Sequence, residues 1–184
     1  MSTLPTLMFD TALAVPDVEG EAGASRVLGV DVPHQEQDQW CWCALTVGVS
    51  RFSDSSFALS QCETAARVLQ VPEACGRPAD DDVNRMFELD AALATFGRLK
   101  RMDPIPLSFK GIQDAIDAKR PVGARVLFLD TGMAHFTLIR GYRTSPMNML
   151  LIDDPLYDES EWSYQEFVAS YRGSGEWRQS YLTQ

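Results

Sequence analysis

The segment Trp40-Cys-Trp-Cys-Ala-Leu-Thr-Val-Gly-Val-Ser-Arg-Phe52 has apolar residues at the spacing of a helix. Counted from Cys41, they recur at i, i+3, i+4, i+7, i+8 and i+11, the pattern of a helix with one buried face. Asp38 lies just before the segment and is placed to accept a hydrogen bond from the first turn. The spacing therefore predicts a helix over residues 41–52, with Cys41 in its first turn.

Further helices and then strands follow along the chain. The same reasoning predicts helices over residues 60–69, 81–96 and 108–119, each closed by a proline or a glycine. Beyond them the hydrophobic period changes to that of strands. The predicted strands span residues 122–129, 135–142, 149–153 and 177–183, the last as an edge strand, with a short helix over 163–171. Helices first and strands afterwards predict an α+β fold rather than a parallel α/β fold.

The composition excludes several classes of protein. The chain has 184 residues, which fits one domain, and its 26 acidic against 16 basic residues give a net charge of -10. Nucleic-acid binding depends on clustered cations, so we expect no nucleic-acid partner. A membrane-spanning helix needs about 20 consecutive apolar residues, and we expect no membrane partner because the sequence has no such run. The sequence does not indicate an oligomeric state.

The N-terminal segment differs from the rest of the chain. Residues 1–25 contain no Lys or Arg, and Asp10 interrupts the only apolar run, so we predict no signal peptide. We therefore expect a cytoplasmic protein, or one secreted by a specialised route that needs no signal peptide. Residues 1–26 are interpreted as an acidic, mobile leader or a pro-segment, and residues 27–184 as the folded domain.

The four cysteines allow three interpretations: buried thiols, a metal site or a nucleophile. Cys41 and Cys43 have one residue between them, and on a helix they point about 200° apart, so they cannot easily share a zinc ion. Cys43 is interpreted as a small core residue. Cys62 and Cys75 could pair in an oxidising compartment, but without an export signal we favour free thiols.

Cys41 is the candidate nucleophile because it begins the predicted helix. A helix N-terminus carries roughly +0.5 of a charge, which favours a thiolate over a thiol. A thiolate nucleophile needs a proton-transfer partner, and the chain has two histidines, His34 in the preceding loop and His135 at the start of a strand. Gln35, six residues before Cys41, could donate its amide N–H to an oxyanion beside the backbone N–H of Cys41.

The predicted hairpin formed by residues 135–142 and 149–153 places a carboxylate near His135. In this hairpin Asp154 lies one diagonal step from His135, a separation that an imidazole–carboxylate hydrogen bond can span. Asp153 then faces the other way, although a slip of one residue in register would exchange the two acids. A carboxylate in this place holds the imidazole in the reactive tautomer and stabilises the imidazolium.

The order of these motifs resembles that of the papain-like cysteine proteases. Gln35, Trp40-Cys41-Trp42, His135 at a strand start and Asp154-Pro155 occur together in the compact bacterial branch of this family, which includes effector proteases delivered into host cells. The likeness covers residues from about 32 to the C-terminus. It also includes Ser60-Gln-Cys-Glu63, Arg120-Pro-Val122, Gly175-Glu-Trp177 and Tyr181-Leu-Thr183.

The resemblance implies a fold, a site and an activity. An N-terminal helical lobe would carry Cys41 as the nucleophile, and a C-terminal antiparallel β lobe would carry His135 as the base and Asp154 as the orienting acid. Gln35 would support the oxyanion hole. The implied activity is hydrolysis of peptide bonds in a peptide or protein substrate through a thioester, which needs no cofactor or metal. The alternatives are an acyltransferase, deamidase or peptide-maturation enzyme with the same triad, or a non-catalytic binding module.

Overall fold

The computed structural model describes residues 23–184. Most of the predicted leader, residues 1–26, lies outside the described residues. Its last two residues belong to β1 (Ser25–Val27), which pairs with β4 (Ala134–Arg143). Within the described part, no helix is long and apolar enough to cross a membrane.

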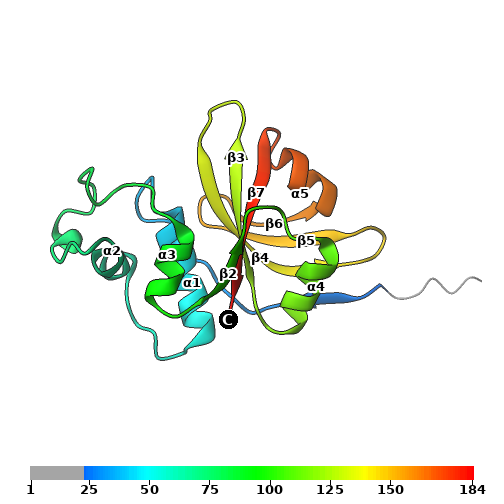
Figure 1. Ribbon diagram of the computed structural model, residues 1–184, viewed down its shortest axis with the longest axis horizontal. Helices are drawn as coiled ribbons and strands as arrows, with labels where there is room; N and C mark the ends of the chain where they lie inside the picture. The colour runs from blue at the N-terminus through cyan, green and yellow to red at the C-terminus, as the bar shows by residue number, and fades with distance from the viewer. Residues whose placement is uncertain (1–22) are drawn as a thin grey trace, which may run out of the picture.

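Three helices form a helical lobe on one side of the molecule (Figure 1). They are α1 (Cys41–Ser53), α2 (Gln61–Leu69) and α3 (Leu89–Thr95), with a short 3-10 helix at Ala74–Gly76 between the last two. The prediction of α1 is confirmed, but the expected single buried face is wrong. Every residue from 41 to 50 is buried, because α1 contacts α2 and α3 on one side and β4 on the other.

The predicted helix over residues 81–96 is wrong in its first half, since α3 begins only at Leu89. The segment before α3 uses its backbone carbonyls for tertiary contacts. The indole N–H groups of Trp40 and Trp42 donate to the carbonyls of Val83 and Arg85, both at 2.9 Å. Buried indoles need such partners, and these two contacts hold the segment against α1 in a non-helical conformation.

A seven-stranded antiparallel sheet forms the second lobe, in the order β2-β7-β3-β4-β5-β6, with β1 paired to β4. Besides β1 and β4, the strands are β2 (Leu99–Asp103), β3 (Val122–Phe128), β5 (Met149–Asp154), β6 (Asp158–Ser163) and β7 (Gly175–Thr183). The helices α4 (Phe109–Asp117) and α5 (Tyr164–Ser170) pack against the sheet (Figure 1). The α+β prediction is confirmed. The last strand, β7, is not an edge strand, because the unpredicted β2 pairs with it.

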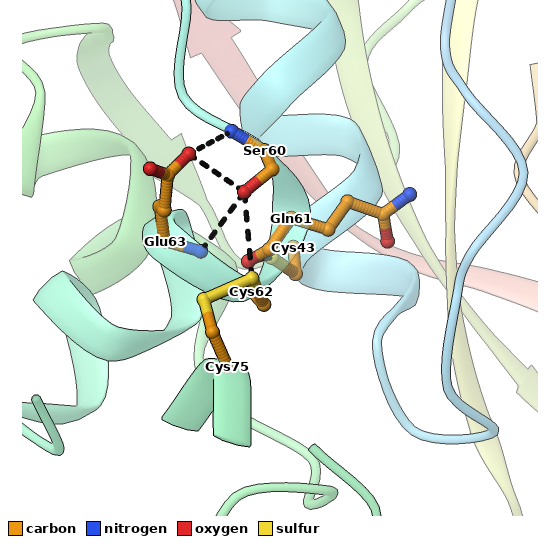
Figure 2. Close-up of a disulfide and its surroundings, with 6 residues drawn as sticks. All are labelled: Cys43, Ser60, Gln61, Cys62, Glu63 and Cys75. Atoms are coloured by element: carbon orange, nitrogen blue, oxygen red, sulfur yellow. Dashed lines mark hydrogen bonds between the residues drawn. A yellow bond between two sulfur atoms is a disulfide. The ribbon is translucent and has the colours of Figure 1, made fainter. Parts of the chain in front are cut away.

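Cys62 and Cys75 form a disulfide, so our preference for free thiols is wrong. The bond joins the first turn of α2 to the 3-10 helix, as Figure 2 shows. The expectation rested on the redox compartment alone. The turn after α2 returns residue 75 to the start of that helix, which brings the two sulfur atoms within bonding distance.

We expect the double variant Cys62→Ser/Cys75→Ser to be less stable than the wild type. The two residues are 13 positions apart, and closing a loop of that size contributes about 3 kcal/mol by restricting the unfolded chain. Urea unfolding of both proteins, with and without a reductant, measures the difference. A reductant that lowers the stability of the double variant as much as that of the wild type would contradict this assignment.

Candidate active site

A cavity of about 440 Å³ lies where the two lobes meet. Gln35, Cys41 and Met86 line it from the helical lobe and the loops around it, and His135, Tyr157 and Arg172 line it from the sheet lobe. All of the predicted site residues except the buried Asp154 thus face one space.

Cys41 is the first residue of α1, and its side chain lies at the wall of the cavity. The residue that caps the helix is Trp40, which forms no side-chain hydrogen bond to the first turn, so the predicted capping role of Asp38 is wrong. Among the described residues, no backbone carbonyl accepts a hydrogen bond from the N–H of Cys41. This uncapped helix end offers a backbone donor next to the thiol.

His135 and Asp154 form a buried hydrogen bond. His135 Nε2 lies 2.8 Å from Asp154 Oδ1, and the two side chains are 9% and 0% exposed. The pairing of Leu138 with Asp153 in strands β4 and β5 produces the predicted register. Asp153 points away and accepts a hydrogen bond from the backbone N–H of Val32 at 2.9 Å. The structure therefore pairs His135 with Asp154, not with Asp153.

The surroundings of this pair favour its charged form. Burial alone lowers the pKa of His135, but interactions with Asp154 and Cys41 outweigh it and raise the pKa to about 9. Burial raises the pKa of Asp154, whereas its hydrogen bonds to His135 and Tyr171 lower it, and the net result is a lowered pKa. At neutral pH the pair is therefore an imidazolium and a carboxylate. The other ring nitrogen, Nδ1, is not used in the hydrogen bond to Asp154 and can interact with the Cys41 thiol.

Tyr171 is a site residue that the sequence analysis missed. Its hydroxyl donates to Asp154 Oδ2 at 2.7 Å, while the backbone N–H groups of Leu156 and Tyr157 donate to Oδ1 at 2.9 and 3.2 Å. These donors fix the carboxylate in the orientation that binds His135. The sequence signal was weak: a tyrosine at the end of a short helix, whose buried hydroxyl needs a partner.

Gln35 lines the same cavity as Cys41, but its side-chain N–H groups already donate hydrogen bonds elsewhere. Its Nε2 donates to the carbonyls of Gln37 and Asp38 at 3.0 and 2.9 Å. Within the part of the chain that the structure describes, its Oε1 is buried without a hydrogen-bond partner. The backbone N–H of Gln35 donates to the carbonyl of Pro155 at 2.9 Å, which ties this loop to the strand end that carries Asp154.

The remaining candidates lie away from the reactive groups. Cys43 is buried in α1, and burial raises the pKa of its thiol well above the usual value. His34 is an exposed loop residue that pairs with Asp158. Of the four cysteines, Cys41 alone lines the cavity.

The sequence matches a family model described as the Peptidase C39-like family, over residues 29–181. The match spans both lobes and every residue of the cavity named above. No curated protein matches the sequence.

Proposed function

Since the chain belongs to the Peptidase C39-like family of papain-like cysteine proteases, we propose that it hydrolyses peptide bonds with Cys41, His135 and Asp154 as its catalytic triad. The family supports a cysteine peptidase function in general, and with it peptide or protein substrates. The assignment of roles to individual residues is our proposal. It is carried by one observation: His135, which pairs with the buried Asp154, lines the same cavity as Cys41, and none of the other three cysteines lines that cavity.

In the proposed mechanism, the Cys41 thiolate attacks the carbonyl carbon of the scissile peptide bond and forms a C–S bond. The carbonyl oxygen takes up the negative charge, and His135 gives its Nδ1 proton to the leaving amine as the C–N bond breaks. Water then attacks the thioester, with His135 as the base, and releases the acid and the thiol. Asp154 remains ionised and stabilises the imidazolium.

The oxyanion hole in this proposal combines the backbone N–H of Cys41 with Gln35. The helix end supplies the first donor without further rearrangement. Gln35 supplies the second when the oxyanion replaces one of the two carbonyls that its amide now binds. A charged oxygen is a stronger hydrogen-bond acceptor than a neutral carbonyl, so this exchange is favoured as the negative charge develops.

Alkylation by iodoacetamide tests the thiolate–imidazolium pair directly. We expect Cys41 to react rapidly below pH 7 and Cys43 to remain unmodified in the folded protein, because Cys43 does not line the cavity and burial raises the pKa of its thiol. In His135→Ala the reaction of Cys41 should require a much higher pH, since the cation that stabilises the thiolate is gone. Mass spectrometry of peptides from the alkylated protein assigns each site. Equal reactivity of Cys41 in wild type and His135→Ala would contradict the proposed triad.

The rate of peptide hydrolysis should fall as the pH rises through about 9, where His135 loses the proton that the leaving amine needs. The free energy of unfolding that the His135–Asp154 ion pair contributes also falls as the pH rises. Because the pKa of His135 is raised on folding, this contribution is complete below about pH 6.5 and is lost as the pH approaches about 9. Digestion of a synthetic peptide library across this range measures the rate. The masses of the products distinguish hydrolysis from acyl transfer to an amine.

A further inference from the structure

We propose that Gln61 is a positioning residue for Gln35, which it holds through the two peptide groups on either side of that residue. The proposal rests on the proposed function, because it assumes that Gln35 and the N–H of Cys41 bind the oxyanion. Gln61 itself does not line the cavity, so it would act only through the loop.

The contacts of Gln61 single it out. Gln61 is 3% exposed, and its side chain donates from Nε2 to the carbonyl of His34 at 2.6 Å and accepts at Oε1 from the N–H of Glu36 at 3.1 Å. Both ends of the amide are therefore used, and each binds a peptide group adjacent to Gln35. Removing the amide would leave a partly buried donor and acceptor in the loop without partners.

The backbone of Gln61 is itself held in place, as Figure 2 shows. Ser60, just before it, caps α2 through a capping box with Glu63. Cys62, just after it, forms the disulfide with Cys75. The thiol of Cys43 in α1 donates to the carbonyl of Gln61 at 3.1 Å. In the same view the Gln61 side chain extends away from the disulfide. The amide thus projects from a rigid helix start toward a loop without regular secondary structure.

The opposite side of the loop is fixed by the sheet lobe, where the N–H of Gln35 donates to the carbonyl of Pro155. The loop is therefore hydrogen-bonded on both sides, to Gln61 in α2 and to Pro155 after β5. Together these hydrogen bonds hold Gln35 in place relative to Cys41. Loss of one side would let the Gln35 amide shift relative to Cys41 while the His135–Asp154 pair stays in place.

Two chemical probes separate this role from a purely structural one. Iodoacetamide alkylates the Cys41 thiolate at a saturated carbon, and no oxyanion forms. p-Nitrophenyl acetate acylates the same thiolate through a tetrahedral oxyanion, and nitrophenolate leaves. We would measure both rates in wild type, Gln35→Met, Gln61→Met and the double variant, with Cys41→Ala as the blank. Gln165→Met is the matched control, because Gln165 is exposed on α5 and lies outside the cavity.

We expect Gln35→Met to slow acylation about 100-fold, the usual cost of an oxyanion donor, and Gln61→Met to slow it at least about 10-fold, since a misplaced donor loses much of its effect. Alkylation should stay at the wild-type rate in both. The double variant should be no slower than Gln35→Met alone, because Gln61 acts through Gln35.

Three results would overturn the proposal: unchanged acylation in Gln61→Met, an equal loss of both reactions, or multiplied effects in the double variant. A wild-type protein that is alkylated quickly at Cys41 but is never acylated there would instead contradict the proposed function.

Discussion

Replacing Cys41 by alanine is expected to abolish peptide hydrolysis, with a fall in kcat of about a million-fold. Loss of a nucleophile in a triad typically has this size, and what remains comes from the oxyanion hole and substrate binding. Cys41 lines the cavity and the other three cysteines do not: the Cys43 thiol hydrogen-bonds to the carbonyl of Gln61, and Cys62 and Cys75 are bonded to each other. No second thiol can therefore take over the reaction.

Cys43→Ala is the matched control for this loss. It removes a thiol two residues away in the same helix, and the hydrogen bond it gives up, from a thiol to the Gln61 carbonyl, is a weak one. We expect kcat close to that of the wild type. Both variants should unfold at nearly the wild-type temperature, so that a loss of activity cannot come from a loss of fold. Substantial hydrolysis by Cys41→Ala, or an equal loss in Cys43→Ala, would place the nucleophile elsewhere.

The parts of the site that follow from local rules could be predicted from the sequence. Helical spacing places Cys41 at the start of α1, because the apolar residues after it must be buried together. The hairpin of β4 and β5 places Asp154 near His135 because strand side chains alternate, but the register there also depends on a shift between Ile139 and Gly141. The first prediction needs only the neighbouring residues along the chain, whereas the second also depends on that shift, which the sequence pattern does not reveal.

The incorrect and missing elements depend on distant contacts. The segment before α3 has a helical pattern, but its backbone carbonyls accept hydrogen bonds from the indole N–H groups of Trp40 and Trp42. The two tryptophans lie more than 40 positions earlier in the chain. The sequence of β6, Asp158-Glu-Ser-Glu-Trp-Ser163, lacks alternating apolar residues because an exposed edge strand buries little. Neither feature is visible to a rule based on hydrophobic period.

The second layer of the site could not be predicted for the same reason. Tyr171 reaches Asp154 only because α5 packs against β7 and the chain turns back at Arg172, which has a φ of 51°. Gln61 lies 26 positions after Gln35, and nothing in the spacing links the two. Sequence patterns identify reactive residues by their chemical type, whereas the residues that orient them are ordinary polar side chains distinguished only by position.

The second large effect is expected from Asp154→Asn, which should lower kcat by about 10²- to 10⁴-fold, the contribution that a positioned general acid and base typically makes. Asparagine has the shape of aspartate, so its oxygen can still accept from the N–H groups of Leu156 and Tyr157. The negative charge is lost, however, and with it much of the stabilisation of the imidazolium. The pKa of His135 should therefore fall from about 9 toward the value set by burial.

Asp153→Asn is a closely matched control, because Asp153 is the adjacent residue, is also buried and faces away from His135. Burial raises the pKa of Asp153, so neutralising it removes a charge that the fold does not favour. We expect Asp153→Asn to keep the wild-type kcat and pH profile. The pH dependence of Cys41 alkylation and of peptide hydrolysis, measured on both variants, gives a readout that loss of structure alone would not produce. In Asp154→Asn the rapid alkylation at low pH should disappear, whereas in Asp153→Asn it should remain. The reverse pattern would show that the acid of the triad is Asp153 and that the register of β4 and β5 is shifted by one residue.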